Sequence, residues 1–166
     1  MPGEALRVQL TSMAVETPEF PIALRRFVYD HLLSRGLPPS SEQIGEHFGV
    51  STDDARHAIG SLKIGKTVLP HPTTGEIWMA GPFAARPSTY RVVGRRLAWW
   101  ANCAWDMLGV MVIANEPVCV ETECIDCREP LTIDANPAQG VAQSMRNLVV
   151  HFLVPARHWY DDIGFT

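Results

Sequence analysis

The sequence predicts an α+β protein, in which an N-terminal winged-helix-like helical lobe precedes a small mixed or antiparallel sheet packed on a central buried helix. Helical periodicity with capping residues recurs over residues 20–62. A long apolar run without proline follows at 95–114, and short alternating segments typical of strands come after it. A linker rich in Pro, Gly and Ala separates the two parts, so we expect lobes at 1–82 and 83–166.

The N-terminal lobe combines capped helices with a predicted hairpin. After a lead-in of weak periodicity, serine caps and a closing glycine indicate three helices. The lead-in covers 1–18 and the helices are expected at 21–36, 41–49 and 51–62. Two short strands around the turn at Thr73-Thr74-Gly75 would then form a wing. Helix, short helix, tight turn and helix is the helix-turn-helix pattern.

The charge of this lobe argues against DNA binding. Residues 1–90 contain eight Lys or Arg and nine Asp or Glu. The helix that would read the bases opens with Asp53 and Asp54, where phosphate contacts would be needed. We therefore favour a structural or substrate-covering role for the lobe, and nucleic acid is not expected as a partner.

The overall composition narrows the class of protein. The formal net charge of -4 does not favour binding to polyanions. The N-terminus lacks a basic start followed by an apolar stretch, and no apolar run is free of charge over a membrane's thickness. We expect a cytoplasmic protein without a membrane partner. In that compartment the four cysteines would be reduced thiols, metal ligands or catalytic groups.

The apolar run at 95–114 predicts a helix of several turns that is buried on every face. Its few polar side chains are chiefly Asn102, Cys103 and Asp106. Since residues three apart share a helix face, the thiol of Cys103 and the carboxyl of Asp106 would address one small volume. Burial raises the proton affinity of an unpaired carboxylate, and a thiol beside it is either inert filler or a nucleophile and soft-metal ligand. This pair is the leading candidate site.

The rest of the chain predicts strands. Alternation at 116–124 suits a strand in which Cys119 has a packing role, and residues 124–134 add a turn and a second strand. A loop or short helix is expected at 135–146, then a buried strand at 147–155 that includes His151 as a core residue. The chain closes with a short helix or tail.

The order of these elements, with the segment RRLAWWANCAWD at 95–106, resembles the organomercurial (alkylmercury) lyase family. In that family a segment of the form RRLYAWCALD carries a catalytic Cys and, three residues on, a catalytic Asp. The match falls on Cys103 and Asp106. Cys124 resembles a family Cys in the following strand and turn, and residues 150–152 resemble a VHFF-like strand. The resemblance covers roughly residues 20–160.

One departure concerns a second catalytic Cys, which the family places just before its VHFF-like strand. Asn147 stands about there in this chain, and no cysteine follows Cys127. The resemblance implies cleavage of a carbon–mercury bond by protonolysis, in which thiolates hold the mercury and the carboxyl delivers a proton to the departing carbon. Cys103 would then be nucleophile and mercury ligand, and Asp106 the proton donor, with no cofactor required.

The missing thiolate could come from Cys124 or Cys127 if their hairpin folds against the helix. Cys103, Cys124 and Cys127 are therefore the candidate metal ligands, and mercury, zinc or copper are the ions that such thiols would hold.

Other classes of function remain open. The C-x-x-C spacing of Cys124 and Cys127 is that of a zinc or copper(I) knuckle, which would suit a non-catalytic metal-binding protein. An enzyme on the lyase scaffold could also use Cys103 and Asp106 on a substrate without mercury, for example in a biosynthetic step. In either enzymatic case the partner is a small-molecule or organometallic substrate. A winged-helix DNA-binding regulator is the least favoured reading.

Overall fold

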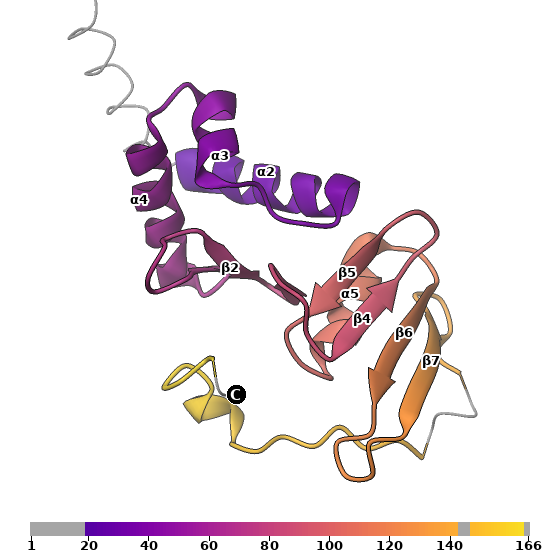
Figure 1. Ribbon diagram of the computed structural model, residues 1–166. Coiled ribbons are helices and arrows are strands. Elements are labelled where there is room, and N and C mark those ends of the chain that lie inside the picture. The colour runs from indigo at the N-terminus through magenta and orange to yellow at the C-terminus, as the bar shows by residue number, and fades with distance from the viewer. Residues whose placement is uncertain (1–18, 143–146, 165–166) are drawn as a thin grey trace, which may run out of the picture.

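The structure is a computed structural model that describes residues 19–142 and 147–164. The predicted lead-in at 1–18 and part of the predicted loop at 135–146 lie outside these residues. Helices gather at one end of the molecule, and strands with a further helix form the other end (Figure 1). Helices packed beside an antiparallel sheet make this an α+β fold, as predicted.

The three helices predicted for the N-terminal lobe are confirmed. They are α2 (Phe20–Arg35), α3 (Ser41–Phe48) and α4 (Thr52–Leu62), followed by the 3-10 turn η1 (Lys63–Gly65). Ser40 forms a capping box with Gln43 at the start of α3, and the Ser51 side chain accepts from the Asp54 backbone N–H at the start of α4. Gly36, with φ of 82°, ends α2 in the left-handed conformation that glycine adopts without strain.

One antiparallel sheet runs through the chain in the order β1-β2-β3-β5-β4-β6-β7-β8. Its strands are β1 (Val68–Pro70), β2 (Ile77–Ala80), β3 (Phe83–Ala84), β4 (Tyr90–Val93), β5 (Ala98–Ala101), β6 (Val118–Glu123), β7 (Pro130–Asn136) and β8 (Gly140–Val141). The strands expected around the turn at 73–75 and on either side of the hairpin cysteines are thus confirmed.

The predicted helix over 95–114 is wrong in its first half. Residues 98–101 form strand β5, which pairs with β4 on one side and β3 on the other. The AWWA sequence alternates between Trp99 and Ala101, which are buried, and Ala98 and Trp100, which are partly exposed. Pairing on both edges satisfies the backbone of this segment, and this tertiary context overrides the helical propensity of its alanines.

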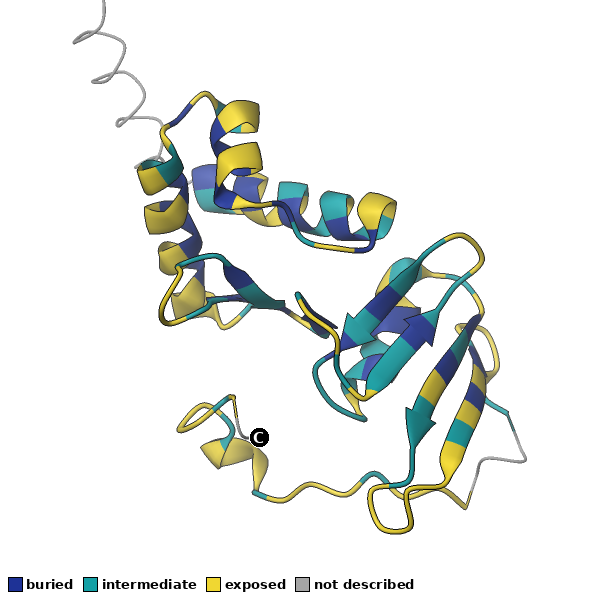
Figure 2. Cartoon of the chain, viewed as in Figure 1, coloured by how far each residue is buried: buried dark blue, intermediate teal, exposed yellow. Residues whose placement is uncertain are grey.

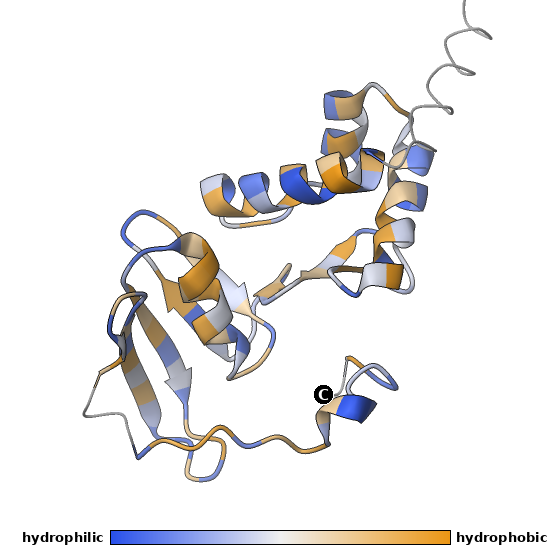
Figure 3. Cartoon of the chain, turned by 180° about the vertical axis from the view of Figure 1, so that it is seen from behind, coloured by the Kyte–Doolittle hydropathy of each residue, from blue (hydrophilic) through white to orange (hydrophobic). Residues whose placement is uncertain are grey.

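The helix of this region is α5 (Asp106–Ala114), which is half as long as predicted and is not buried all round. Met107, Val110 and Met111 face the sheet, whereas the side chain of Val112 is 63% exposed. Seen from behind, the hydrophobic helix covers one face of the sheet (Figure 3). The predicted central buried helix is therefore a helix that packs on one face.

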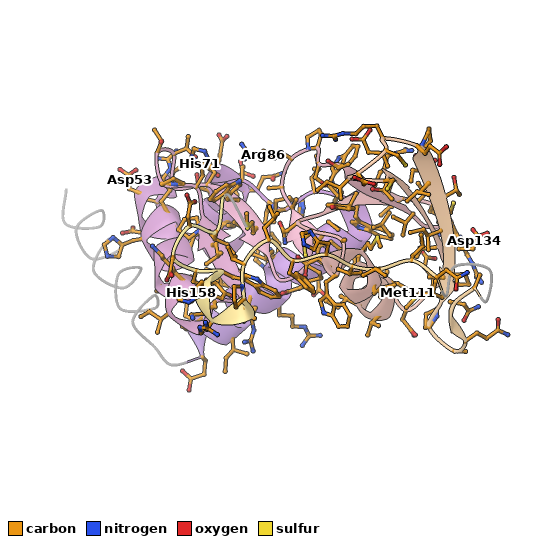
Figure 4. All side chains as sticks on the ribbon, turned by 90° about the horizontal axis from the view of Figure 1, so that it is seen from below. Asp53, His71, Arg86, Met111, Asp134 and His158 are labelled. Atoms are coloured by element: carbon orange, nitrogen blue, oxygen red, sulfur yellow. The ribbon has the colours of Figure 1, made fainter. Side chains whose placement is uncertain are left out.

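The strand predicted at 147–155 is also absent from the residues that the structure describes there. Val149 is 87% exposed and Leu153 is 63% exposed, and His151 lies at the surface instead of in the core. β8 already pairs with the edge of β7, so the segment does not extend the sheet. It runs as irregular chain to the 3-10 turn η3 (Ala156–His158). Seen from below, the tail crosses from the end that carries Asp134 toward the helical end, where His158 lies (Figure 4).

A single hydrophobic cluster joins the helical end to the sheet. Buried residues line the inner faces of the helices and continue into β4 and β5 (Figure 2). The indole N–H of Trp99 donates to the Leu32 carbonyl at 2.8 Å, so β5 is tied to the last turn of α2. Within the described residues, no helix is long and apolar enough to cross a membrane.

The carboxylate of Glu76 fastens the turn between β1 and β2 to the start of α3. It accepts from the backbone N–H of Ser41 at 2.8 Å and from the Ser41 hydroxyl, and Arg56 Nε lies 3.4 Å from it. Burial alone would raise the pKa of Glu76, but the Ser41 hydrogen bonds and the Arg56 charge outweigh it and lower that pKa. Glu76 thus acts as a capping anion supplied from outside the helix.

Replacing Glu76 with alanine should lower the free energy of unfolding by about 1–2 kcal/mol at neutral pH, because hydrogen bonds to a charged acceptor are lost. A folded-state pKa below the unfolded value means that this contribution is present at neutral pH and disappears as pH falls through the folded pKa. Urea unfolding of Glu76→Ala and of the wild type should therefore converge in acid. Glu46→Ala, an exposed change in α3, is the matched control.

Candidate functional site

Cys103 and Asp106 lie in the connection from β5 to α5. Cys103 occupies the turn after β5, and Asp106 is the first residue of α5. The Asp106 backbone N–H donates to the Cys103 carbonyl at 3.1 Å, which folds the turn tightly. The predicted helix is wrong at Cys103, yet the spacing of three residues still places the two side chains together.

The thiol and the carboxyl are in direct contact. Cys103 Sγ lies 3.4 Å from Asp106 Oδ2, with the thiol as donor, and both side chains are partly buried. This is within hydrogen-bond range for a sulfur donor, so a proton can pass from sulfur to oxygen without movement of the backbone.

Burial governs the protonation of both groups. Desolvation raises the pKa of the Asp106 carboxyl more than hydrogen bonds from Cys103 and Asn102 lower it. Desolvation and the nearby Asp106 charge likewise raise the pKa of the Cys103 thiol, although the backbone N–H groups of Asp106 and Trp105 partly oppose this. Both groups therefore hold protons more firmly than they would in water.

The pair opens into a cavity of about 350 Å³. Its walls come from distant parts of the chain: the β1–β2 hairpin region, the segment between β3 and β4, the turn before α5 and the C-terminal tail. Among the lining residues are Lys66, Trp78, Met79, Arg86, Ser88, Asn102, Cys103, Asp106, Phe152, Trp159 and Tyr160. A volume of this size suits a small molecule.

Aromatic rings and two cations surround the opening. Lys66 Nζ lies 4.0 Å from the centre of the Tyr160 ring, and the Arg86 guanidinium lies 5.3 Å from the Trp78 ring. Lys66 therefore links the N-terminal lobe to the C-terminal tail across the cavity.

Asn102 provides a polar group in the wall beside the pair. Its amide N–H donates to the Gly81 carbonyl at 2.8 Å, while its Oδ1 is buried without a partner in the described structure. A buried acceptor without a donor is costly, and this oxygen is closed to solvent in the structure.

The structure does not bring the hairpin thiols to Cys103. Cys124 and Cys127 lie in the turn between β6 and β7, and neither lines the cavity. Over residues 19–142 and 147–164, no three His, Cys, Asp or Glu side chains lie close enough to hold a metal ion together. Asn147, at the position of the family's second Cys, is exposed and is not a lining residue.

Sequence reasoning missed the aromatic and cationic walls. The sequence around Lys66 and Trp78 gives no sign of a role in a site, because the residues that complete the cavity beside them lie in a tail more than seventy residues later in the chain. No local spacing carries that signal. Cys119, for which the sequence predicts a packing role, is partly buried on β6 and pairs across the sheet with Asp134.

The sequence was compared with known protein families. The model described as alkylmercury lyase matches residues 83–165, which is half of the chain and includes Cys103, Asp106 and the tail. The chain belongs to the alkylmercury lyase family. Membership in this family supports a lyase-type function for the protein, and it confirms the resemblance found in the sequence.

A solved structure with the same fold extends the comparison beyond the family match. It is described as the crystal structure of the mercury-bound form of MerB2, with a TM-score of 0.58 and 14% sequence identity. The alignment covers 83% of this chain and 66% of that chain, so the present chain spans about two thirds of its length. At this identity the similarity concerns the fold alone. A search of curated proteins gave no match.

Proposed function

We propose that the protein cleaves carbon–mercury bonds by protonolysis, with Cys103 as nucleophile and mercury ligand and Asp106 as proton donor. The observation that carries the proposal is the 3.4 Å contact between the Cys103 thiol and the Asp106 carboxyl at a cavity wall. Family membership supports the same chemistry.

The pair supports a balanced sequence of two steps. As the Cys103 sulfur bonds to the mercury of R–Hg–X, its proton passes to Asp106 and X leaves as the anion. Asp106 then gives that proton to the carbon of R as the carbon–mercury bond breaks, which releases R–H and leaves mercuric ion on sulfur. The raised pKa of Asp106 favours the protonated carboxyl that the second step needs.

The second sulfur on mercury has to come from elsewhere, because Cys103 is the one cysteine lining the cavity within the described part of the chain. Mercuric ion is soft and prefers sulfur ligands. An external thiol can occupy this position, since the cavity is reachable by a small molecule. The metal set of Cys103, Cys124 and Cys127 stays a prediction for which the cavity lining gives no support.

For the N-terminal lobe we propose a winged-helix-like module that covers the substrate. Three helices followed by the β1–β2 hairpin support this reading, and the hairpin region supplies Lys66 and Trp78 to the cavity. The Arg56 side chain of α4 lies against Asp53 and Glu76, so its charge is already paired. The proposed boundary at 82/83 falls immediately before β3.

A second candidate is an enzyme on the same scaffold whose substrate contains no mercury. Asn102 favours it, because this polar side chain lines the cavity beside the pair and its amide is not a soft ligand for mercury. Cys103 and Asp106 would keep their roles as nucleophile and acid.

Turnover of phenylmercury acetate by the purified protein, with a monothiol in the buffer, tests the first proposal. The expected result is release of benzene in amounts that exceed the protein many-fold. Stoichiometric binding of phenylmercury without benzene release would reject it and leave the second candidate.

A further inference from the structure

The turn between β6 and β7 places two thiols side by side at the surface. The Arg128 N–H donates to the Cys124 carbonyl at 2.9 Å, and the Cys124 N–H donates to the Glu129 carbonyl at 2.8 Å. Arg128 adopts a left-handed conformation with φ of 61°, which closes the turn. The chain between the two cysteines is thereby coiled, and side chains three apart in such a coil share one side.

The two thiols contact each other and the backbone of the turn. The backbone N–H groups of Cys127 and Asp126, followed by the Cys127 thiol, donate to the Cys124 sulfur and lower its pKa. At Cys127 a backbone hydrogen bond from Glu129 lowers the pKa, but donation to Cys124 and desolvation raise it, and the net shift is upward. The Cys124 and Cys127 side chains are therefore in hydrogen-bond contact with each other.

The surroundings of the pair are stable and acidic. Arg128 Nη1 lies 2.5 Å from Glu123 Oε1, an ion pair that braces the turn from the strand side. Asp126 and Glu129 flank the sulfurs in the sequence and add negative charge. Cys127 is exposed and Cys124 partly exposed, so an ion can reach both sulfurs without unfolding of the hairpin.

The ligand set limits the kind of ion. A structural zinc site needs four protein ligands, and in the described residues no third His, Cys, Asp or Glu stands with these two thiols. Two sulfurs from one turn suit a soft ion of low coordination number, whose remaining position stays open to an external thiol.

We propose that Cys124 and Cys127 form a second, independent site that chelates one soft metal ion, mercuric or cuprous, at the surface of the hairpin. The site lies apart from the Cys103 cavity, and its two thiols give up their protons as two metal–sulfur bonds form. It does not depend on the proposed lyase activity, because binding there requires neither Cys103 nor Asp106.

Mercuric chloride titration of a Cys103→Ser/Cys119→Ser variant tests the site, since the remaining cysteines are Cys124 and Cys127. Under reducing conditions with excess monothiol, the ultraviolet sulfur-to-mercury band should saturate at one ion per chain. Further change of Cys124 or Cys127 to serine should weaken retention by about 10²-fold, because chelation from one turn gives the second sulfur an effective concentration in the millimolar range or above.

Ile125→Ala in the same background is the matched control, because it alters the exposed turn but keeps both sulfurs. It should bind as the parent does. Equal retention in the single-thiol variants, or loss of the ion to the monothiol in the parent, would overturn the proposal. Circular dichroism of each variant checks that the fold is kept. Because no turnover is measured, failure here is distinct from failure of the lyase proposal.

Discussion

Replacing Cys103 with serine should lower kcat/KM for phenylmercury by about 10³-fold or more, the order of loss seen when an enzyme loses its nucleophile. A serine hydroxyl is nearly the same size, but its oxygen is a hard ligand that binds mercury poorly and does not ionise near neutral pH. Binding at the cavity should fail together with cleavage. Benzene release by gas chromatography measures cleavage, and mercury retention after gel filtration measures binding once Cys119, Cys124 and Cys127 have been changed to serine in both proteins.

Cys119→Ser is the matched control for this change, because Cys119 lies on β6 outside the cavity. This variant should keep wild-type turnover. Undiminished activity in Cys103→Ser would contradict the assignment of the nucleophile, and equal losses in both variants would indicate a general effect on the fold.

Replacing Asp106 with asparagine should separate capture of mercury from cleavage. The amide keeps the shape of the side chain but cannot carry the proton, so turnover should fall by about 10²- to 10⁴-fold, as expected for loss of a general acid. Phenylmercury should still bind to Cys103, in one equivalent once Cys119, Cys124 and Cys127 have been changed to serine. Mass spectrometry of the protein after a single addition would show an uncleaved phenylmercury adduct that persists.

The dependence of the turnover rate on pH should show the proton relay through Asp106. Asp106 must be ionised to accept the Cys103 proton, so the rate should rise through its pKa, which burial places above the usual carboxyl range. At high pH the thiol has already lost its proton and none remains to deliver, so the rate should fall through the raised pKa of Cys103. The acidic limb should vanish in Asp106→Asn. An acidic limb unchanged in that variant would reject Asp106 as the relay.

Stability provides the control for the same variant. A folded-state pKa above the unfolded value means that the Asp106 carboxylate disfavours folding once pH exceeds the unfolded pKa. Asp106→Asn should therefore unfold at a Tm equal to or above that of the wild type at neutral pH. Loss of activity with a lowered Tm would point to damage instead of lost chemistry.

Local signals predicted most of the N-terminal lobe. Ser40 and Ser51 cap helices through side-chain contacts a few residues away, and Gly36 ends α2 through its own backbone conformation. These interactions need no information from the rest of the chain. Composition predicts helix for the segment around Trp99, whereas its strand structure depends on partners in β3 and β4 that composition does not reveal.

The candidate site likewise has one part that local sequence predicts and another that depends on distant parts of the chain. Cys103 and Asp106 could be paired from the sequence because their contact spans three residues, and it survives although Cys103 is not helical. The cavity could not be predicted, since Lys66 and Tyr160 meet only after the tail folds back. Val149 and Leu153 were expected in a core because an apolar run does not itself show whether a sheet edge is free to receive it.

The two-residue strand β3 has a consequence for selectivity. Phe83 pairs with Ala80 on one side and Ala101 on the other, and its buried ring packs near Tyr29 and Trp99. Strand β3 therefore lies between β2, which carries Trp78, and β5, which leads to Cys103. These two walls of the cavity are separated by this one short strand. We expect a larger or smaller side chain at Phe83, which does not line the cavity, to shift these two walls relative to each other and so to change which molecules fit.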